Sequence, residues 1–218
     1  MTALKKSPPR DRSHLLVATR STHKLRELRE LLGLRAELID LDDAGIDAEA
    51  IEDGETFEAN ASKKARFFAA LSGLPTLADD SGIEVDELGG APGVRTRRYA
   101  GENATDEENN VKLLEALRGV VASRRGARYR CVLALALPES RGPRGGIRIR
   151  LAHGTLEGRI AAAPKGTGGF GYDPIFEPAA EPPGGRTLGE WTAEAKNRIS
   201  HRGNAARRMH RILVDLGF

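Results

Sequence analysis

The sequence predicts an α/β protein with a mixed β-sheet, folded as one domain of two lobes with a cleft between them. Short apolar runs that suit buried strands alternate with segments whose apolar residues recur at spacings of three and four, the period of an amphipathic helix. Hydrophobic residues make up 39% of the chain and charged residues 30%, which is typical of a globular protein rather than a disordered one. The pattern contains no internal repeat and no long linker.

The first predicted unit is a strand, a turn and a helix. Residues 15–18 form a short apolar run that suits a buried strand, and hydroxyl residues in the following turn can cap a helix. Leu25, Leu28 and Leu32 then mark one helical face, and Gly33 is a suitable end for that helix.

The second unit follows an acidic stretch over residues 40–55, which has little periodicity and is expected to be a loop. A helix is predicted over 55–71 and ends at Gly73. A short strand over 76–78 then runs directly into Asp-Asp-Ser-Gly at 79–82. The helix places four apolar side chains on one face, namely Phe57, Ala61, Ala65 and Phe68.

The second half of the chain begins with a capping box at Thr105, which opens a helix with apolar positions at Val111, Leu114 and Leu117. Ser200 can cap a last helix. Between these helices, the sequence predicts a long central strand, a hairpin-type connection, a half-exposed antiparallel strand and a glycine-rich loop, over 128–137, 141–146, 147–151 and 166–171.

The N-terminal residues 1–13 are basic and contain proline but lack the apolar core of a secretory signal. We interpret them as a flexible tail that precedes a single domain over 14–218. No run approaches the roughly 18 apolar residues that a membrane span needs. The one cysteine, Cys131, lies in an apolar run and is interpreted as a core residue, which leaves no intrachain disulfide. We therefore expect a cytoplasmic protein without membrane association.

Charge is unevenly distributed. Residues 40–58 contain nine acids and no Lys or Arg, whereas residues 196–211 contain six Lys or Arg and no acid. Such blocks are often solvated faces. Placed around one cleft, they would bind a cation and a polyanion together.

A phosphate site is suggested by the first turn between strand and helix. Backbone N–H groups at a helix N-terminus are unpaired and carry partial positive charge. Thr19, Ser21 and Thr22 add hydroxyl groups there, and Lys24 adds a cation in the first turn. The glycines of a Walker A motif or a dinucleotide fingerprint are missing.

A metal site is suggested by Asp79 and Asp80, which follow buried strand residues. Buried carboxylates are costly unless they meet a cation or hydrogen-bond donors, and magnesium prefers such oxygen ligands. Neighbouring strand side chains point to opposite faces, so we expect only one of the two to face the cleft. Glu52 could supply a further carboxylate.

Base recognition is suggested by the loop over 166–173, whose glycines permit close approach and whose Phe170 and Tyr172 can stack on a purine. Asp173 could orient the backbone or pair with a purine edge. Further along, Lys196 and Arg202 offer cations for phosphate, and His201 is expected to titrate near physiological pH.

Each of these features alone also fits a structural role, as a capped helix, a surface turn, a hairpin turn or a solvated basic face. Their joint occurrence at loops and helix starts favours a functional site.

The segments together resemble the inosine triphosphate pyrophosphatase family over about residues 14–216. The matching strings include Leu-Val-Ala-Thr at 16–19, Gly-Glu-Thr-Phe-Glu-Ala-Asn-Ala at 54–61 and Ala-Asp-Asp-Ser-Gly-Ile-Glu-Val-Asp at 78–86. Gly-Thr-Gly-Gly-Phe-Gly-Tyr-Asp-Pro-Ile-Phe at 166–176 and Lys-Asn-Arg-Ile-Ser-His-Arg-Gly at 196–203 complete the match.

The resemblance implies hydrolysis of deaminated purine nucleoside triphosphates (ITP, dITP and XTP) between the α- and β-phosphates, with Mg²⁺ as cofactor. It also implies an elongated α/β architecture and a homodimer. Asp80 would be the catalytic acid/base and, with Glu52, a metal ligand. The remaining implied residues would contact substrate: Thr19, Arg20, Ser21, Thr22, His23, Lys24, Lys64, Ser81, Phe170, Gly171, Tyr172, Asp173, Lys196, His201 and Arg202.

The chain departs from the family pattern at two places. Thr19-Arg20-Ser21 stands where the family usually has Thr-Gly-Asn, which adds the charge of Arg20 to the phosphate turn. Arg95-Thr96-Arg97 stands where the family has Tyr-Ser-Ala or Phe-Ser-Ala, which is expected to alter substrate entry or the dimer surface.

Two other functions stay open on sequence alone. A pI of 9.2 and the basic last helix fit a non-catalytic binder of nucleotides or nucleic acid. The low aromatic content of 5% argues against direct nucleic-acid binding, because basic residues are not interleaved with stacking aromatics. A house-cleaning enzyme for pyrimidine nucleotides is the second alternative.

Overall fold

The computed structural model describes residues 14–139 and 146–218 of the chain. Within these residues, six strands form one sheet in the order β2-β1-β3-β4-β5-β6. The expected tail (1–13) lies outside the described residues, as does nearly all of the connection predicted over 141–146.

The elements have the following bounds. The strands are β1 (His14–Val17), β2 (Glu37–Ile39), β3 (Thr76–Val85), β4 (Gly126–Pro138), β5 (Ile147–Ile160) and β6 (Phe176–Pro178). The α-helices are α1 (Thr22–Leu32), α2 (Phe57–Ser72), α3 (Asp106–Ala116), α4 (Ala193–Ile199) and α5 (His201–Asp215). Short 3-10 helices are η1 (Asp86–Leu88), η2 (Gly93–Arg98), η3 (Ala122–Arg124), η4 (Asp173–Ile175) and η5 (Leu188–Glu190).

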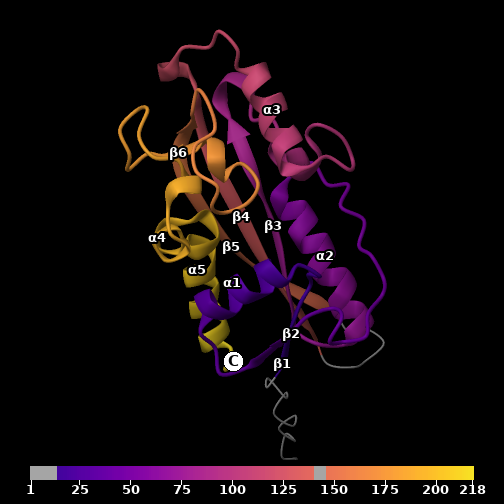
Figure 1. Ribbon diagram of the computed structural model, residues 1–218. Coiled ribbons are helices and arrows are strands. Elements are labelled where there is room, and N and C mark those ends of the chain that lie inside the picture. The colour runs from indigo at the N-terminus through magenta and orange to yellow at the C-terminus, as the bar shows by residue number, and fades with distance from the viewer. Residues whose placement is uncertain (1–13, 140–145) are drawn as a thin grey trace, which may run out of the picture.

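The sheet is mixed, as the sequence predicts. Strands β2, β1 and β3 run parallel, and β3, β4, β5 and β6 pair antiparallel. Long strands β3, β4 and β5 give the molecule its elongated shape (Figure 1). None of the helices in the described part of the chain is long and apolar enough to cross a membrane.

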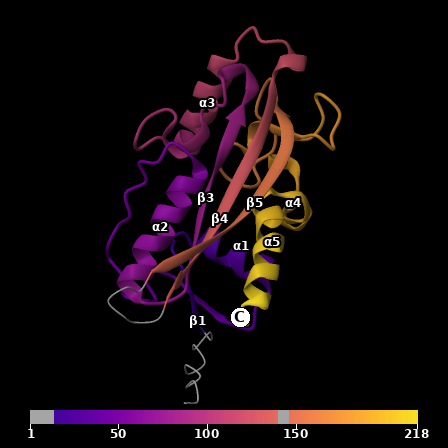
Figure 2. The ribbon, with the colours of Figure 1, turned by 180° about the vertical axis from the view of Figure 1, so that it is seen from behind.

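Helices cover both faces of the sheet (Figures 1 and 2). Side-chain alternation along β3 assigns the faces: Leu77 packs in a core with α1 and α5, whereas Ala78 packs in a core with α2. A third core joins the far half of β3 to α3 and to the segment around Tyr172. The predicted α/β class with flanking helices is therefore confirmed.

An opening in the sheet lies beside β3. Strand β1 pairs with β3 only as far as Val17 opposite Leu77. On the same side, η2 packs against β3 further along the strand, and the Ile83 N–H donates to the Thr96 hydroxyl at 2.9 Å. Between these contacts, β3 residues 79–81 are bordered by neither β1 nor η2, and we call them the open edge of β3.

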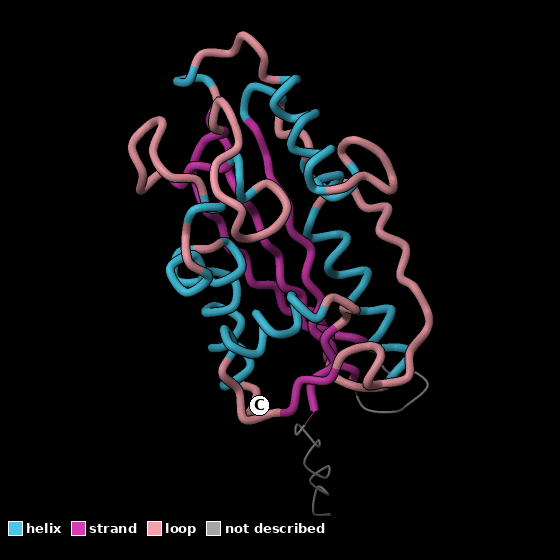
Figure 3. Tube along the Cα trace, in the orientation of Figure 1, coloured by secondary structure: helices cyan, strands magenta, loops and turns pink. Residues whose placement is uncertain are grey.

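Helix boundaries follow the predicted caps. The Ser21 hydroxyl accepts from the Lys24 N–H at the start of α1, and Gly33 ends that helix with a positive φ of 51°. Ser200 caps α5 in the same way. The acidic stretch expected as loop has no helix or strand over residues 40–56 (Figure 3).

Three predictions about elements are wrong, and three short elements were missed. The antiparallel strand expected over 147–151 continues to Ile160, because it pairs with β4 along nearly its whole length. The strand expected over 76–78 continues to Val85, because its backbone pairs with β4 through the two aspartates. Val111 is 56% exposed on α3, and Leu113 takes the buried position instead. Short elements β2, β6 and α4 were not predicted, since three to seven residues carry too little periodicity.

Candidate active site

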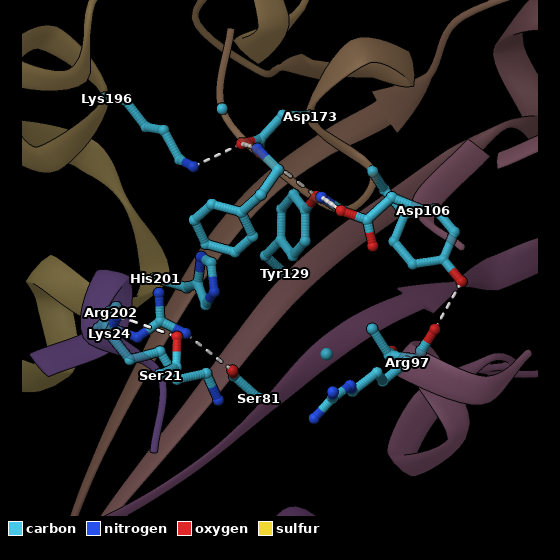
Figure 4. Close-up of a pocket in the computed structure, with 16 residues that line it drawn as sticks. Ser21, Lys24, Ser81, Arg97, Asp106, Tyr129, Asp173, Lys196, His201 and Arg202 are labelled. Carbon is cyan, nitrogen blue, oxygen red and sulfur yellow. Dashed lines mark hydrogen bonds and ion pairs between the residues drawn. The ribbon is translucent and has the colours of Figure 1, made fainter. Parts of the chain in front are cut away.

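A cavity of about 380 Å³ lies beside β3 and β4, and residues from both ends of the chain line it (Figure 4). Ten of the residues implied by the resemblance line it, from α1, β3, the glycine-rich loop, α4 and α5. They are Ser21, Lys24, Ser81, Phe170, Gly171, Tyr172, Asp173, Lys196, His201 and Arg202. Side chains more than 170 residues apart in the sequence therefore meet in one cavity.

The N-terminal turn of α1 contributes Ser21 and Lys24 to this cavity. Its other polar residues do not line it. The Arg20 guanidinium turns to the acidic loop, where it donates to Asp42 at 2.8 Å and to the Ala48 carbonyl at 3.1 Å. The Thr19 hydroxyl accepts from the Ser21 N–H and shapes the turn. Arg20 thus does not add its charge to the predicted phosphate turn.

Two further residues of this turn were predicted to bind substrate. Thr22 is exposed at the first position of α1 and is not among the cavity-lining residues. The side chain of His23 lies outside the described part of the structure.

Asp79 faces the cations of α1 and α5. Its carboxylate accepts from Lys24 Nζ at 2.5 Å, from Arg202 Nε at 3.1 Å and from the Cys131 thiol at 3.3 Å. Burial alone would raise the pKa of Asp79, but Arg202 and Lys24 outweigh it and hold that pKa well below its usual range. Asp79 is therefore a permanent anion that fixes two cations.

Arg202 is the centre of this network. The side chain is 1% exposed, and its Nε, Nη1 and Nη2 atoms donate to Asp79, to Glu27 at 2.7 Å and to the Ser81 hydroxyl at 3.0 Å. The planar fork expected to bind phosphate is thus occupied by protein groups. Arg202 holds α1, β3 and α5 together beside the cavity.

Asp80 lies on the opposite face of β3, toward α2, as strand alternation requires. It is not among the cavity-lining residues. The expectation that its carboxylate shares one cavity with Lys24, Lys196 and Arg202 is therefore wrong, because Asp80 lies on the other face of β3. Its Oδ1 atom accepts from the Ser81 N–H at 3.0 Å. Its Oδ2 atom is buried and has no hydrogen-bond partner within the described residues.

The pKa of Asp80 reflects this environment. Burial, assisted by the charges of Asp79 and Glu52, outweighs the attraction of Lys64 and raises the pKa of Asp80 to about 6. The two adjacent aspartates are therefore shifted in opposite directions, one toward a stable anion and the other toward a proton carrier.

Lys64 joins the two faces at the open edge. Its ammonium group donates to the Asp79 carbonyl at 3.1 Å and forms an ion pair with Glu52 at 2.5 Å. Glu52 reaches this point from the acidic loop, and Lys64 from α2. An ammonium thus stands among carboxylates at the position where the sequence predicts a metal.

The residues around Asp80 fit a magnesium ion. No group of three or more His, Cys, Asp or Glu side chains within 14–139 and 146–218 is arranged as a metal site. Magnesium, however, keeps several waters and commonly takes only one or two protein carboxylates together with substrate phosphates. The partnerless Oδ2 atom of Asp80 and the nearby Glu52 carboxylate supply that donor set.

The glycine-rich loop is ordered by Asp173. This buried carboxylate accepts from the Phe170 N–H at 2.9 Å, from Lys196 Nζ at 2.5 Å and from the Tyr129 hydroxyl at 3.4 Å. Gly169 has a φ of 77°, and a Cβ there would overlap the Asp173 carboxylate. Two roles were predicted for Asp173, and the structure shows one of them, in which its carboxylate orients the loop backbone.

The two aromatic residues of the loop differ. Phe170 is 47% exposed, with Lys196 Nζ 4.2 Å from its ring centre. Tyr172 is buried, and its hydroxyl donates to the Thr96 carbonyl at 2.8 Å. Phe170 therefore has an accessible face for a planar ligand, whereas Tyr172 forms part of the wall.

His201 is buried and stacks on Tyr129, with ring centres 4.7 Å apart. Burial, reinforced by Arg202 and Lys196, lowers the pKa of His201 well below its usual range. The expectation that His201 titrates near physiological pH is therefore wrong, because both its neighbours and its burial favour the neutral ring.

Sequence reasoning missed several cavity residues. Thr96 and Arg97 come from η2, Tyr129 from β4, and Asp106 from α3. No site role was predicted for Asp106, yet its carboxylate accepts from the Gly171 N–H at 2.6 Å. The charge of Arg97 was recognised as a departure from the family pattern. Its place beside the cavity was not predictable, because it depends on the packing of η2 against β3.

Known proteins similar to this chain match it over nearly its whole length. A model of the Ham1 family matches residues 15–212. The dITP/XTP pyrophosphatase of Geobacter sulfurreducens is 50% identical over 194 residues, which cover 88% of this chain and 92% of that protein. The dITP/XTP pyrophosphatase of Shigella flexneri is 47% identical, with 88% and 93% covered. The solved structure of a HAM1 protein from Coxiella burnetii has a TM-score of 0.82 at 41% identity, covering 93% of this chain and 98% of that one.

Proposed function

The chain belongs to the Ham1 family, and we propose that it hydrolyses the deaminated purine nucleoside triphosphates ITP, dITP and XTP to nucleoside monophosphate and pyrophosphate. Such an activity removes these nucleotides before they enter DNA or RNA. The observation that carries the proposal is the open edge of β3, where a carboxylate with a partnerless oxygen adjoins a cation-lined cavity with an accessible aromatic ring.

The base occupies the cavity in this proposal, with its plane on the exposed ring of Phe170. Lys196 lies beside that ring and can only donate hydrogen bonds. A 6-oxo group accepts such a bond, whereas the 6-amino group of adenine would leave the donor mispaired at a cost of about 1–3 kcal/mol. Lys196 therefore favours hypoxanthine and xanthine over adenine.

The phosphate chain runs from the cavity toward the N-terminus of α1 and the open edge. Ser21 and Lys24 lie on one side of that edge, and Lys64 lies on the other. Phosphoryl transfer needs positioning and charge neutralisation more than covalent chemistry, so these groups suit it. Asp79 fixes the position of Lys24 throughout.

Asp80 and Glu52 would hold Mg²⁺ in this proposal, with Asp80 also acting as the general base. When bound, the ion would neutralise charge on the phosphate oxygens and increase the acidity of water. A water molecule attacks the α-phosphorus, its proton passes to the Asp80 carboxylate, and the bond between the α-phosphorus and the bridging oxygen breaks to release pyrophosphate. The raised pKa of Asp80 suits a group that gains and loses a proton near neutral pH.

Two further expectations, on oligomeric state and location in the cell, accompany this proposal. We expect a homodimer, as the family resemblance implies, and sedimentation velocity at micromolar concentration tests it by measuring twice the chain mass of 23.5 kDa. We also place the enzyme in the cytoplasm, where a buried free thiol such as Cys131 stays reduced.

The decisive assay compares substrates and identifies the phosphate product. ITP, XTP, ATP and pyrimidine triphosphates are incubated with the protein, each with and without Mg²⁺. We expect pyrophosphate from ITP and XTP in the presence of Mg²⁺, and much slower release from the others. Orthophosphate as the first product, equal turnover of ATP, or preference for a pyrimidine would each contradict the proposal.

A further inference from the structure

One arginine of the cavity wall is used by none of the steps above. Arg97 lies on η2 and lines the cavity (Figure 4). It is drawn on the side of the cavity opposite Arg202 and Lys24, with Ser81 between them. None of the roles implied by the family resemblance falls on this position.

The charge of Arg97 differs from that of the other cavity cations. Lys24 is paired with Asp79, Lys196 with Asp173, and Arg202 with both Asp79 and Glu27. The Arg97 side chain is exposed and makes no hydrogen bond or ion pair with any residue within 14–139 and 146–218. A polyanion can therefore bind the Arg97 guanidinium without breaking an existing ion pair.

The backbone beneath Arg97 is held in place. Its own carbonyl accepts from the Asn109 side chain at 3.1 Å, and the preceding Thr96 carbonyl accepts from the Tyr172 hydroxyl at 2.8 Å. The Thr96 hydroxyl also ties η2 to β3 through the Ile83 N–H. The side chain thus projects from a fixed wall, which reduces the loss of freedom on binding.

We propose that Arg97 binds the phosphate chain of the substrate. A planar guanidinium matches phosphate oxygens with two parallel hydrogen bonds. Arg97 adds a positive charge, unpaired within the described residues, to the phosphate site from the wall opposite Lys24. The other cations of the cavity are already paired with carboxylates. The inference rests on the proposed function for its substrate, but the binding of a polyphosphate can be measured without turnover.

The experiment uses two partial ligands, inorganic tripolyphosphate and inosine, and isothermal titration calorimetry in the presence of Mg²⁺. The variants are Arg97→Ala, Arg97→Lys and Arg95→Ala. Arg95 is the matched control, because it is exposed on the same 3-10 helix and its loss changes the charge equally, yet it is not among the cavity-lining residues.

We expect Arg97→Ala to raise the Kd for tripolyphosphate about tenfold, in keeping with the loss of a charge-assisted pair at a partly exposed site. Arg97→Lys should recover part of this loss, since charge remains but the fork does not. Arg95→Ala should stay within about twofold of wild type. Inosine affinity should be equal in all four proteins.

The proposal is overturned if Arg97→Ala and Arg95→Ala bind tripolyphosphate equally well, or if the loss in Arg97→Ala falls on inosine instead. Kinetics with ITP add a separate result, in which KM rises for Arg97→Ala while kcat is kept. Failure of the wild type to release pyrophosphate from ITP would defeat the proposed function, and the tripolyphosphate comparison would still decide the role of Arg97.

Discussion

At the scale of single residues, two neighbouring aspartates have opposite environments because they stand on opposite faces of one strand. Asp79 accepts from two cations and a thiol, and its pKa is held well below the usual range. Asp80 has a buried oxygen without a partner in the described residues, and its pKa is raised to about 6. In the proposed mechanism, Asp79 has the structural role of this pair and Asp80 the chemical one.

Replacing Asp80 by Asn tests that division. The ionised form of Asp80 is disfavoured in the native state, so at neutral pH it destabilises the metal-free fold. Asp80→Asn should raise the Tm of metal-free protein at pH 7.5 by about 2–4 °C, on the order of 1 kcal/mol for a chain of this size, while abolishing pyrophosphate release. Differential scanning calorimetry with a chelator measures the first effect.

The pH dependence of this gain has a defined sign. A carboxyl whose native pKa lies above its unfolded value binds more protons in the native state between about pH 4 and 6, so its destabilising effect appears as pH rises through that window. The advantage of Asp80→Asn should therefore be largest above pH 6.5 and vanish near pH 4. A gain that grows on acidification would contradict the assignment.

Residue chemistry was only partly predictable from the sequence. Alternation along a strand predicted that one aspartate faces the cleft, but not that its carboxylate would be occupied by Lys24 and Arg202. The neutral state of His201 depends on burial against Tyr129, from another element, which no local pattern contains. The cavity position of Arg97 likewise depends on a tertiary contact.

At the scale of elements, the site depends on where strands end. β1 stops pairing at Val17, whereas β3 continues to Val85, and the difference in length creates the open edge. Caps such as Ser21 and Gly33 were predictable, because they use local chemistry. The length of β3 was not, because its polar residues 79–81 stay in the strand through pairing with β4, which is a tertiary contact.

The contact of α5 with β5 gives a prediction at this scale. A Cβ on Gly154 would overlap the His201 carbonyl and the Ala205 N–H, so α5 would have to move away from the sheet. Gly154→Ala should lower the free energy of unfolding by about 1–3 kcal/mol and raise KM for ITP, because α5 carries His201 and Arg202. Urea denaturation and initial rates measure the two effects.

Gly126→Ala is the control for that substitution. Its added Cβ would approach only the exposed carboxylate of Asp86, at 2.7 Å, which can move aside. This variant should keep wild-type kinetics. If Gly154→Ala is as stable and as active as Gly126→Ala, close packing between α5 and β5 does not position the site.

At the scale of the whole molecule, the cavity lies between two halves that share long strands. The glycine-rich loop and α3 belong to one half, and α1, α2 and the acidic loop belong to the other (Figure 1). The α/β class was predictable from alternating strand and helix periods. The convergence of 19–24, 79–82, 166–173 and 196–202 was predictable only through the family resemblance, since spacing along a chain does not determine distance in space.

The structure of a complex with Mg²⁺ and a non-hydrolysable α,β-imido analogue of ITP is the most direct test of this arrangement. We predict the base on Phe170, the ion within about 2.0–2.1 Å of carboxylate oxygens of Asp80 and Glu52, and the α-phosphate at the open edge of β3. An ion bound by Asp79 instead, or a base outside the cavity with the phosphates far from Asp80, would contradict the account.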